Sequence, residues 1–135
     1  MQILKDIGLF LIGLIIGSIV NMLLVEVVGM KIIPPPGGFD MSTEAGLKSA
    51  MNILSFEHFI FPFLAHAIGT LSGAFFVSRF THHKQILAYC IGIAFLSGGI
   101  SMVYMVGGPL WFIILDLTIA YIPMAWLGHR LSAGN

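Results

Sequence analysis

Residues 7–28 read IGLFLIGLIIGSIVNMLLVEVV, and this stretch decides the fold class. It is long enough to cross a bilayer, because a spanning helix needs roughly 20 mostly apolar residues at about 1.5 Å each. Its apolar run is longer than the roughly 7–15 residues of a signal-peptide core, and no Ala-x-Ala-like cleavage motif follows it. We therefore expect a retained transmembrane helix over residues 7–28.

Three more stretches of the chain meet the same length and apolarity requirement, namely residues 56–80, 85–106 and 110–127. Hydrophobic residues make up 58% of the 135 residues and charged residues only 9%, whereas soluble domains carry roughly 25% charged residues. Backbone groups in lipid have no water to bond, so each span must be helical. The sequence predicts an all-α integral membrane protein, a four-transmembrane-helix bundle forming one domain over residues 1–135.

The connection over residues 29–55 is long and contains the segment IPPPGG at 33–38. Prolines favour a stiff extended chain, and the glycines that follow permit a sharp turn. Asp40 or Ser42 is suited to cap a following helix. Apolar residues then recur at helical spacing, at Leu47, Ala50, Met51 and Leu54. We expect a short amphipathic helix in this loop, lying on the membrane surface or covering the end of the bundle.

Pro62 leaves two alternatives for the second span. A proline in the helix interior removes a hydrogen bond and bends the helix, whereas in the first turn it is harmless. Either the helix bends at Pro62, or it begins near Phe61 after a bent lead-in over residues 55–60.

Basic residues near the span ends predict the orientation, because they concentrate on the cytoplasmic side. Four of them fall on one side of the membrane, namely Lys5, Arg79, Lys84 and Arg130. The other two, Lys31 and Lys48, fall on the other side, in the long loop. Both termini are therefore expected in the cytoplasm and the long loop outside. In general layout the chain resembles small four-helix bacterial membrane proteins, which implies the bacterial inner membrane but transfers no site. The six basic and six acidic residues cancel, so a nucleic-acid partner is not expected.

Two Gly-x-x-x-Gly patterns occur, Gly13 with Gly17 in the first span and Gly69 with Gly73 in the second. Glycines let helices approach closely, which matters where lipid gives no hydrophobic drive for association. The patterns predict tight helix contacts, within one chain or between chains.

Six polar residues fall at or near membrane depth, where ionisable groups are costly and mark functional sites. Helical rise places them all toward the outer side, with Asp116 roughly 10 Å below the outer end of its helix. The set comprises Asn21, Glu26, Glu57, His58, His66 and Asp116. Asn21 continues the Gly13–Gly17 face of its helix and Glu26 lies off that face.

The first functional interpretation is a small transport or channel protein that moves protons or small cations through a homo-oligomeric helical bundle. Asp116 and His66 would form the relay with Asn21 beside them, while Glu26, Glu57 and His58 form an outer vestibule. Carboxylates and imidazoles along a wet path are the groups that a proton or ion relay needs. Four helices enclose little volume, which favours a symmetric oligomer.

Two alternatives remain open. A membrane metalloprotein or metalloenzyme would bind a divalent metal, the one candidate cofactor, through His58, His66 and Asp116. The other alternative is a structural or assembly subunit, in which Asp116 only ties helices together. No hydrolase motif occurs and Cys90 is the single cysteine, so the sequence favours a protein that is not an enzyme.

Two further groups are expected at the periphery. Aromatic residues near span ends are typical of the belt that anchors helices at the membrane interface, here Tyr104, Trp111, Tyr121 and Trp126. The turn containing His82, His83 and Lys84 is expected to be solvated.

Overall fold

The computed structural model describes residues 1–134, which are helical apart from short connections and the loop over residues 33–43. Four helical segments are long and apolar enough to cross a membrane: Gln2–Ile32, Phe56–Phe80, Lys84–Val106 and Leu110–Ala133. Residues 1–134 contain no strand. The predictions of an all-helical chain and of four membrane-length segments are therefore confirmed.

The first segment consists of α1 (Gln2–Met22), a π-helical stretch η1 (Leu23–Gly29) and α2 (Met30–Ile32). The second consists of a 3₁₀ turn η2 (Phe56–Phe59) and α4 (Ile60–Phe80), and the third is α5 (Lys84–Val106). The fourth is divided into α6 (Leu110–Ile119) and α7 (Ile122–Ala133). The short helix α3 (Glu44–Ala50) lies in the long loop.

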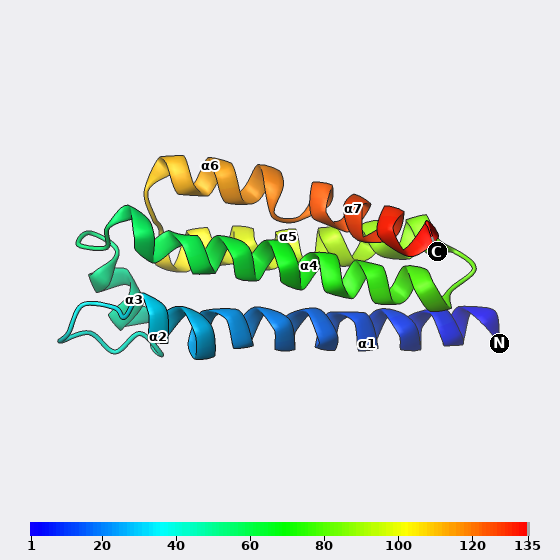
Figure 1. The fold of residues 1–135 in the computed structure, drawn as a ribbon, viewed down its shortest axis with the longest axis horizontal. Helices are drawn as coiled ribbons and strands as arrows, with labels where there is room; N and C mark the ends of the chain where they lie inside the picture. Colours follow the sequence, from blue (N-terminus) through cyan, green and yellow to red (C-terminus); the bar gives the residue numbers. More distant parts are fainter. Residues whose placement is uncertain (135) are drawn as a thin grey trace.

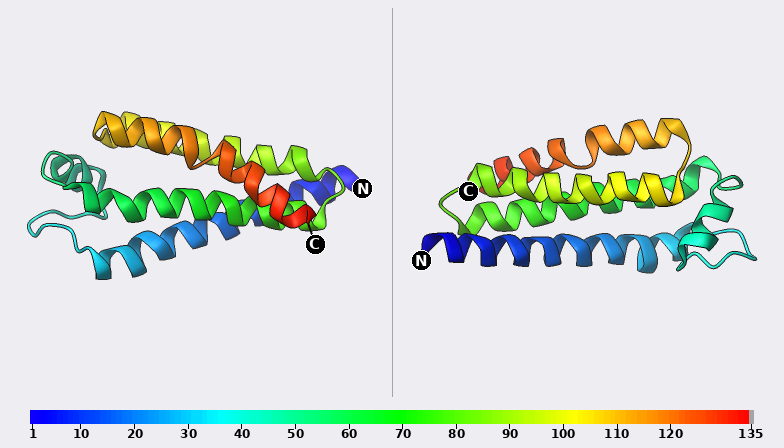
Figure 2. Two further views of the ribbon diagram at one scale, coloured as in Figure 1. Left: turned by 45° about the horizontal axis from the view of Figure 1, so that its top comes forward. Right: turned by 180° about the vertical axis from the view of Figure 1, so that it is seen from behind.

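Successive segments run in opposite directions, so that both chain ends lie at one end and the α3 loop at the other (Figures 1 and 2). We call these the terminal end and the loop end. Helix α4 is the central element, because it packs against α1, α5 and α7. Of its most apolar 18 residues, 39% are buried inside the protein, against 11% in the first segment.

Helices α1 and α4 meet through both predicted glycine pairs. A Cβ added at Gly17 would lie 2.7 Å from the Gly69 carbonyl oxygen, and one at Gly73 would lie 2.6 Å from that of Gly13. Such distances leave no room for a side chain at either position. The predicted tight contact is therefore confirmed within one chain.

The second alternative for Pro62 is correct in outline. Helix α4 begins at Ile60 after the short η2 turn, so Pro62 lies in its first turn. A first-turn proline lacks an N–H that would have no helical partner anyway, so the helix is not interrupted.

The fourth span is not the single helix over residues 110–127 that the sequence predicted. It breaks between Ile119 and Ile122, and Tyr121 has a non-helical φ of −116° and ψ of −81°. Pro123 is the cause, because it has no N–H to bond the carbonyl of Ile119 and its ring crowds that carbonyl. It is accommodated in the first turn of a new helix, α7.

The amphipathic helix predicted in the long loop is confirmed as α3, but its cap is Thr43 rather than Asp40 or Ser42. The Thr43 hydroxyl accepts the Gly46 N–H at 3.1 Å. Asp40 instead accepts hydrogen bonds from the Ser42 hydroxyl at 2.6 Å and backbone N–H at 3.0 Å, which hold the pKa of Asp40 below its usual value. Asp40 and Thr43 thus define consecutive turns before α3.

Candidate functional site

A cavity of about 500 Å³ lies at the loop end and is lined by residues of all four long segments. The segment over residues 33–54, including α3, contributes Ile33, Pro35, Leu47 and Leu54 to its wall. The six polar residues singled out in the sequence all line this cavity: Asn21, Glu26, Glu57, His58, His66 and Asp116. Residues separated by up to 95 positions in the chain are thus brought to one site.

His66 of α4 and Asp116 of α6 form a direct pair in the cavity wall. The Nδ1 atom of His66 lies 2.8 Å and 3.0 Å from the two carboxylate oxygens of Asp116. The Asp116 side chain is 6% exposed and that of His66 is 26% exposed. With an ionised carboxylate, Nδ1 carries the hydrogen, and the lone pair of a neutral imidazole then resides on Nε2. Nε2 has no hydrogen-bond partner within residues 1–134 and is available to a ligand or a proton.

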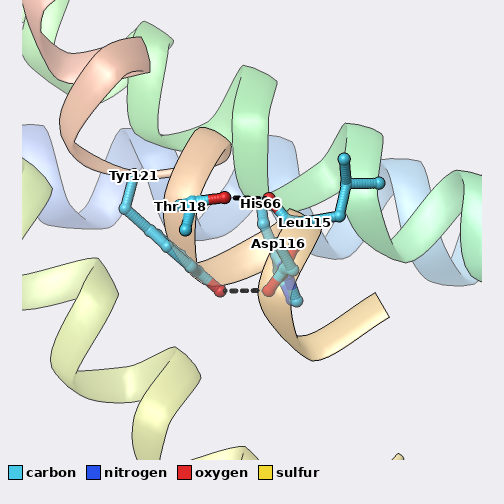
Figure 3. A network of polar contacts seen from close by, with 5 residues as sticks. All are labelled: His66, Leu115, Asp116, Thr118 and Tyr121. Carbon is cyan, nitrogen blue, oxygen red and sulfur yellow. Dashed lines mark hydrogen bonds and ion pairs between the residues drawn. The ribbon is translucent and has the colours of Figure 1, made fainter. Parts of the chain in front are cut away.

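Tyr121 completes this arrangement by donating its hydroxyl hydrogen to Asp116 Oδ2 at 2.9 Å (Figure 3). Its ring stacks on the His66 ring with centroids 5.7 Å apart. Tyr121 is buried, so the prediction that it belongs to an interfacial aromatic belt is wrong. A Cβ at Gly99 of α5 would overlap the Tyr121 hydroxyl, so this glycine makes room for the ring. The break before α7 positions Tyr121, and Pro123 was the sequence signal for it.

Asn21 and Glu26 reach the cavity through a change in helix type. On a regular α-helix the two side chains would point to different faces, as the sequence analysis expected. The chain is π-helical over Leu23–Gly29, and a π-turn takes more residues than an α-turn. Glu26 is thereby carried round toward the face of Asn21, and both line the cavity. The Oδ1 atom of Asn21 is buried without a hydrogen-bond partner within residues 1–134.

His58 lines the cavity, but both of its ring nitrogens are hydrogen-bonded to the loop. Its Nδ1 accepts the Ser55 backbone N–H at 3.2 Å, and the Ser55 hydroxyl lies 2.8 Å from the same atom. The proton of a neutral ring must then be on Nε2, which donates to the Pro34 carbonyl at 3.3 Å. His58 therefore connects the proline segment to the start of the second span.

The predicted metal site is not supported by this geometry. No group of three His, Cys, Asp or Glu side chains able to hold a metal ion occurs within residues 1–134. His66 and Asp116 bond to each other, while both nitrogens of His58 have partners elsewhere. Zinc sites in proteins use three or four convergent side chains.

Apart from Ser42, the remaining lining is apolar and contains flexible side chains. Five of the eight methionines and three phenylalanines contribute to it: Met22, Met30, Met41, Met51, Met102, Phe59, Phe61 and Phe112. Methionine is unbranched and polarizable, so it adapts to ligands of different shape. No lysine or arginine of residues 1–134 lines the cavity, whose ionisable groups are three carboxyls and two imidazoles.

A second polar cluster, which was not predicted from the sequence, lies at the terminal end. Asp6 of α1 accepts the Thr81 hydroxyl at 2.7 Å and the Gln2 amide at 3.1 Å, and its Oδ2 lies 2.7 Å from His83 Nδ1. Thr81 and His83 belong to the α4–α5 turn, which was expected to be merely solvated. This cluster fastens the start of α1 to that turn, and the pairing of an early acid with a polar turn at the same end was the available signal.

Comparisons with known protein families, with curated proteins and with solved structures find no match for this chain. The site is therefore interpreted from its own geometry.

Proposed function

We propose that this chain is a small integral membrane transport protein that moves protons or small cations, with His66 and Asp116 as its proton-binding pair. The observation that carries the proposal is the contrast around α4. A polar cavity opens at one end of the molecule, whereas glycine-to-backbone contacts close the α1–α4 interface immediately beyond it. A site accessible from one side and closed toward the other is what alternating access requires.

The irregular helices at the cavity support this proposal. The break after α6 lies beside Asp116, and the π-helical segment contains Glu26. Transporter sites are typically formed by discontinuous helices, and π-turns are frequent at functional sites. Both irregularities cost regular hydrogen bonding, so their occurrence at this cavity favours a functional role.

The proposal includes a location and an assembly. The four apolar segments would cross a bacterial inner membrane with both termini in the cytoplasm, and the cavity would then face outward. A homo-oligomer would supply the rest of the pathway, because the interior of one chain is closed below His66 and four helices enclose little volume.

Flux in reconstituted vesicles tests the function. We expect Asp116→Asn and His66→Gln to lower proton-coupled flux at least tenfold, measured with a pH-sensitive dye in the vesicle lumen. Thr118→Ala is the matched control on α6, because its hydroxyl bonds only carbonyls of its own helix, at 2.6 Å and 3.3 Å. Flux unchanged in both site variants, with the protein folded, would reject the proposal.

A structural role is the second candidate, and the complete pairing of Asp116 favours it. Its two oxygens bond His66 and Tyr121, which ties α4 to the α6–α7 break. On this interpretation Asp116→Asn would lower thermal stability in detergent, and no flux would be measurable in the unchanged protein.

A further inference from the structure

The cavity carries information on the chemistry of its occupant. We infer that it binds an organic cation with an apolar body, held by the carboxylates of Glu26 and Glu57 over a wall of methionine and phenylalanine side chains. This inference rests on the proposed transport function and names the class of cargo.

Charge is the first argument. The lining contains the carboxyl groups of Glu26, Glu57 and Asp116 and no lysine or arginine of residues 1–134. Asp116 is already paired with His66 and Tyr121, and the hydrogen bonds of His58 are those of a neutral ring. Glu26 and Glu57 are exposed carboxylates that face no lysine or arginine in the cavity, and the hydrogen bonds of Glu57 are to its own backbone and to the Ser55 hydroxyl. They are therefore the carboxylates left without a positively charged partner.

Size and polarity give the second argument. A volume of about 500 Å³ lies within the roughly 300–1,000 Å³ typical of pockets for drug-sized molecules. A bare metal ion would leave most of this space unfilled and would find no group of three ligands within residues 1–134. Phe59, Phe61 and Phe112 contribute to the wall, and aromatic rings attract organic cations through their quadrupoles.

A pair of ions with the same shape and opposite charge tests the inference. Tetraphenylphosphonium and tetraphenylborate would each be dialysed to equilibrium against the full chain in nanodiscs of zwitterionic lipid, with empty nanodiscs as the blank. We expect tetraphenylphosphonium to bind at least about tenfold more tightly than tetraphenylborate. Equal binding, or tighter binding of the anion, would overturn the inference.

Variants locate the binding in the cavity. Glu26→Gln and Glu57→Gln should each weaken tetraphenylphosphonium binding by roughly three- to tenfold. Glu44→Gln is the matched control, because Glu44 lies in the same outer part of the chain but does not line the cavity. Binding that is unchanged in both cavity variants would place the cation elsewhere and refute the assignment.

Failure of this inference differs from failure of the proposed function. If tetraphenylphosphonium binds as expected but vesicles show no flux, the occupant class stands and transport is wrong. If protons move but the cation does not bind, transport stands and the occupant class is wrong.

Discussion

The loop end and the terminal end of this molecule are built from the same four apolar segments, yet a cavity of about 500 Å³ lies at the loop end, whereas the helices meet in a buried cluster toward the terminal end. Toward the terminal end, Ala74, Val77, Ala88, Ile91 and Ala125 form a buried cluster, and the glycines of α1 and α4 meet backbone to backbone. Toward the loop end, the first segment becomes π-helical and α4 is preceded by a 3₁₀ turn, and the fourth segment breaks three residues after Asp116.

The contrast between these two regions indicates that the size of the side chains sets the separation of the helices. Lipid-facing helices gain nothing from hydrophobicity when they associate, so small residues and polar contacts decide where they touch. Glycines form the α1–α4 contact, and alanines make up half of the buried cluster beside it. Methionine, phenylalanine and ionisable residues instead surround the cavity. We therefore expect the closed region to be the more rigid of the two.

Gly17→Ala should disrupt the contact between α1 and α4, and we expect it to lower the stability more than the other substitutions considered. Its new Cβ would lie 2.7 Å from the Gly69 carbonyl oxygen and 2.7 Å from the Phe95 ring, so α1 would have to move away from α4. We expect the free energy of unfolding to fall by about 3 kcal/mol, the upper end for overpacking. Unfolding of the detergent-solubilised protein by a denaturing detergent measures it.

Gly8→Ala is the control for that experiment, because a Cβ at Gly8 on the same helix would meet nothing within 4 Å. Equal stability of the two variants would show that the glycine contact does not hold the closed region together.

Gly99→Ala should affect the cavity and leave the α1–α4 contact intact. The added methyl group would displace the Tyr121 ring, so the hydroxyl would no longer donate to Asp116. We expect a loss of about 1 kcal/mol in unfolding free energy, the scale of interhelical hydrogen bonds in membrane proteins, with several-fold lower flux. Thermal unfolding and vesicle flux measure the two effects.

Two comparisons check this interpretation. Gly98→Ala should be neutral, because a Cβ there would meet nothing within 4 Å. Gly99→Ala made together with Tyr121→Phe should cost little more than either change alone, since both remove the same hydrogen bond. Additive losses would contradict the proposed contact.

The sequence predicted those features that depend on composition and helical period. Four apolar runs of membrane length required four helices, and the spacing of four residues placed Asn21 above Gly13 and Gly17 on the face toward α4. The position of each residue along its helix was enough to place the six polar residues at one end, and all six line the cavity.

Other features depend on departures from the regular α-helix, which the period cannot predict. Glu26 joins Asn21 only because the chain becomes π-helical after Met22. Tyr121 reaches Asp116 only because Pro123 breaks the fourth span. The two ring nitrogens of His58 are hydrogen-bonded to Ser55 and Pro34. Such local bonds cannot be predicted from the residue type alone.

Thr43→Ala should give the smallest effect and tests whether the loop is an independent cover of the cavity. Thr43 caps α3 by accepting the Gly46 N–H at 3.1 Å, and its hydroxyl donates to the Asp40 carbonyl at 3.0 Å. Loss of an N-cap costs roughly 1 kcal/mol. Because Leu47 and Met51, on the helix and just after it, line the cavity, fraying should expose that wall to solvent.

Hydrogen exchange resolved by residue separates local from global opening. We expect faster exchange at the amides of residues 46–50 in Thr43→Ala, with rates in α1 and α4 unchanged, because the cap contacts neither helix. Ser49→Ala is the control, since its hydroxyl bonds only the Ala45 carbonyl at 2.8 Å within α3. Faster exchange throughout α4 would mean that loop and helices open together, and the two ends of the molecule would then be one cooperative unit.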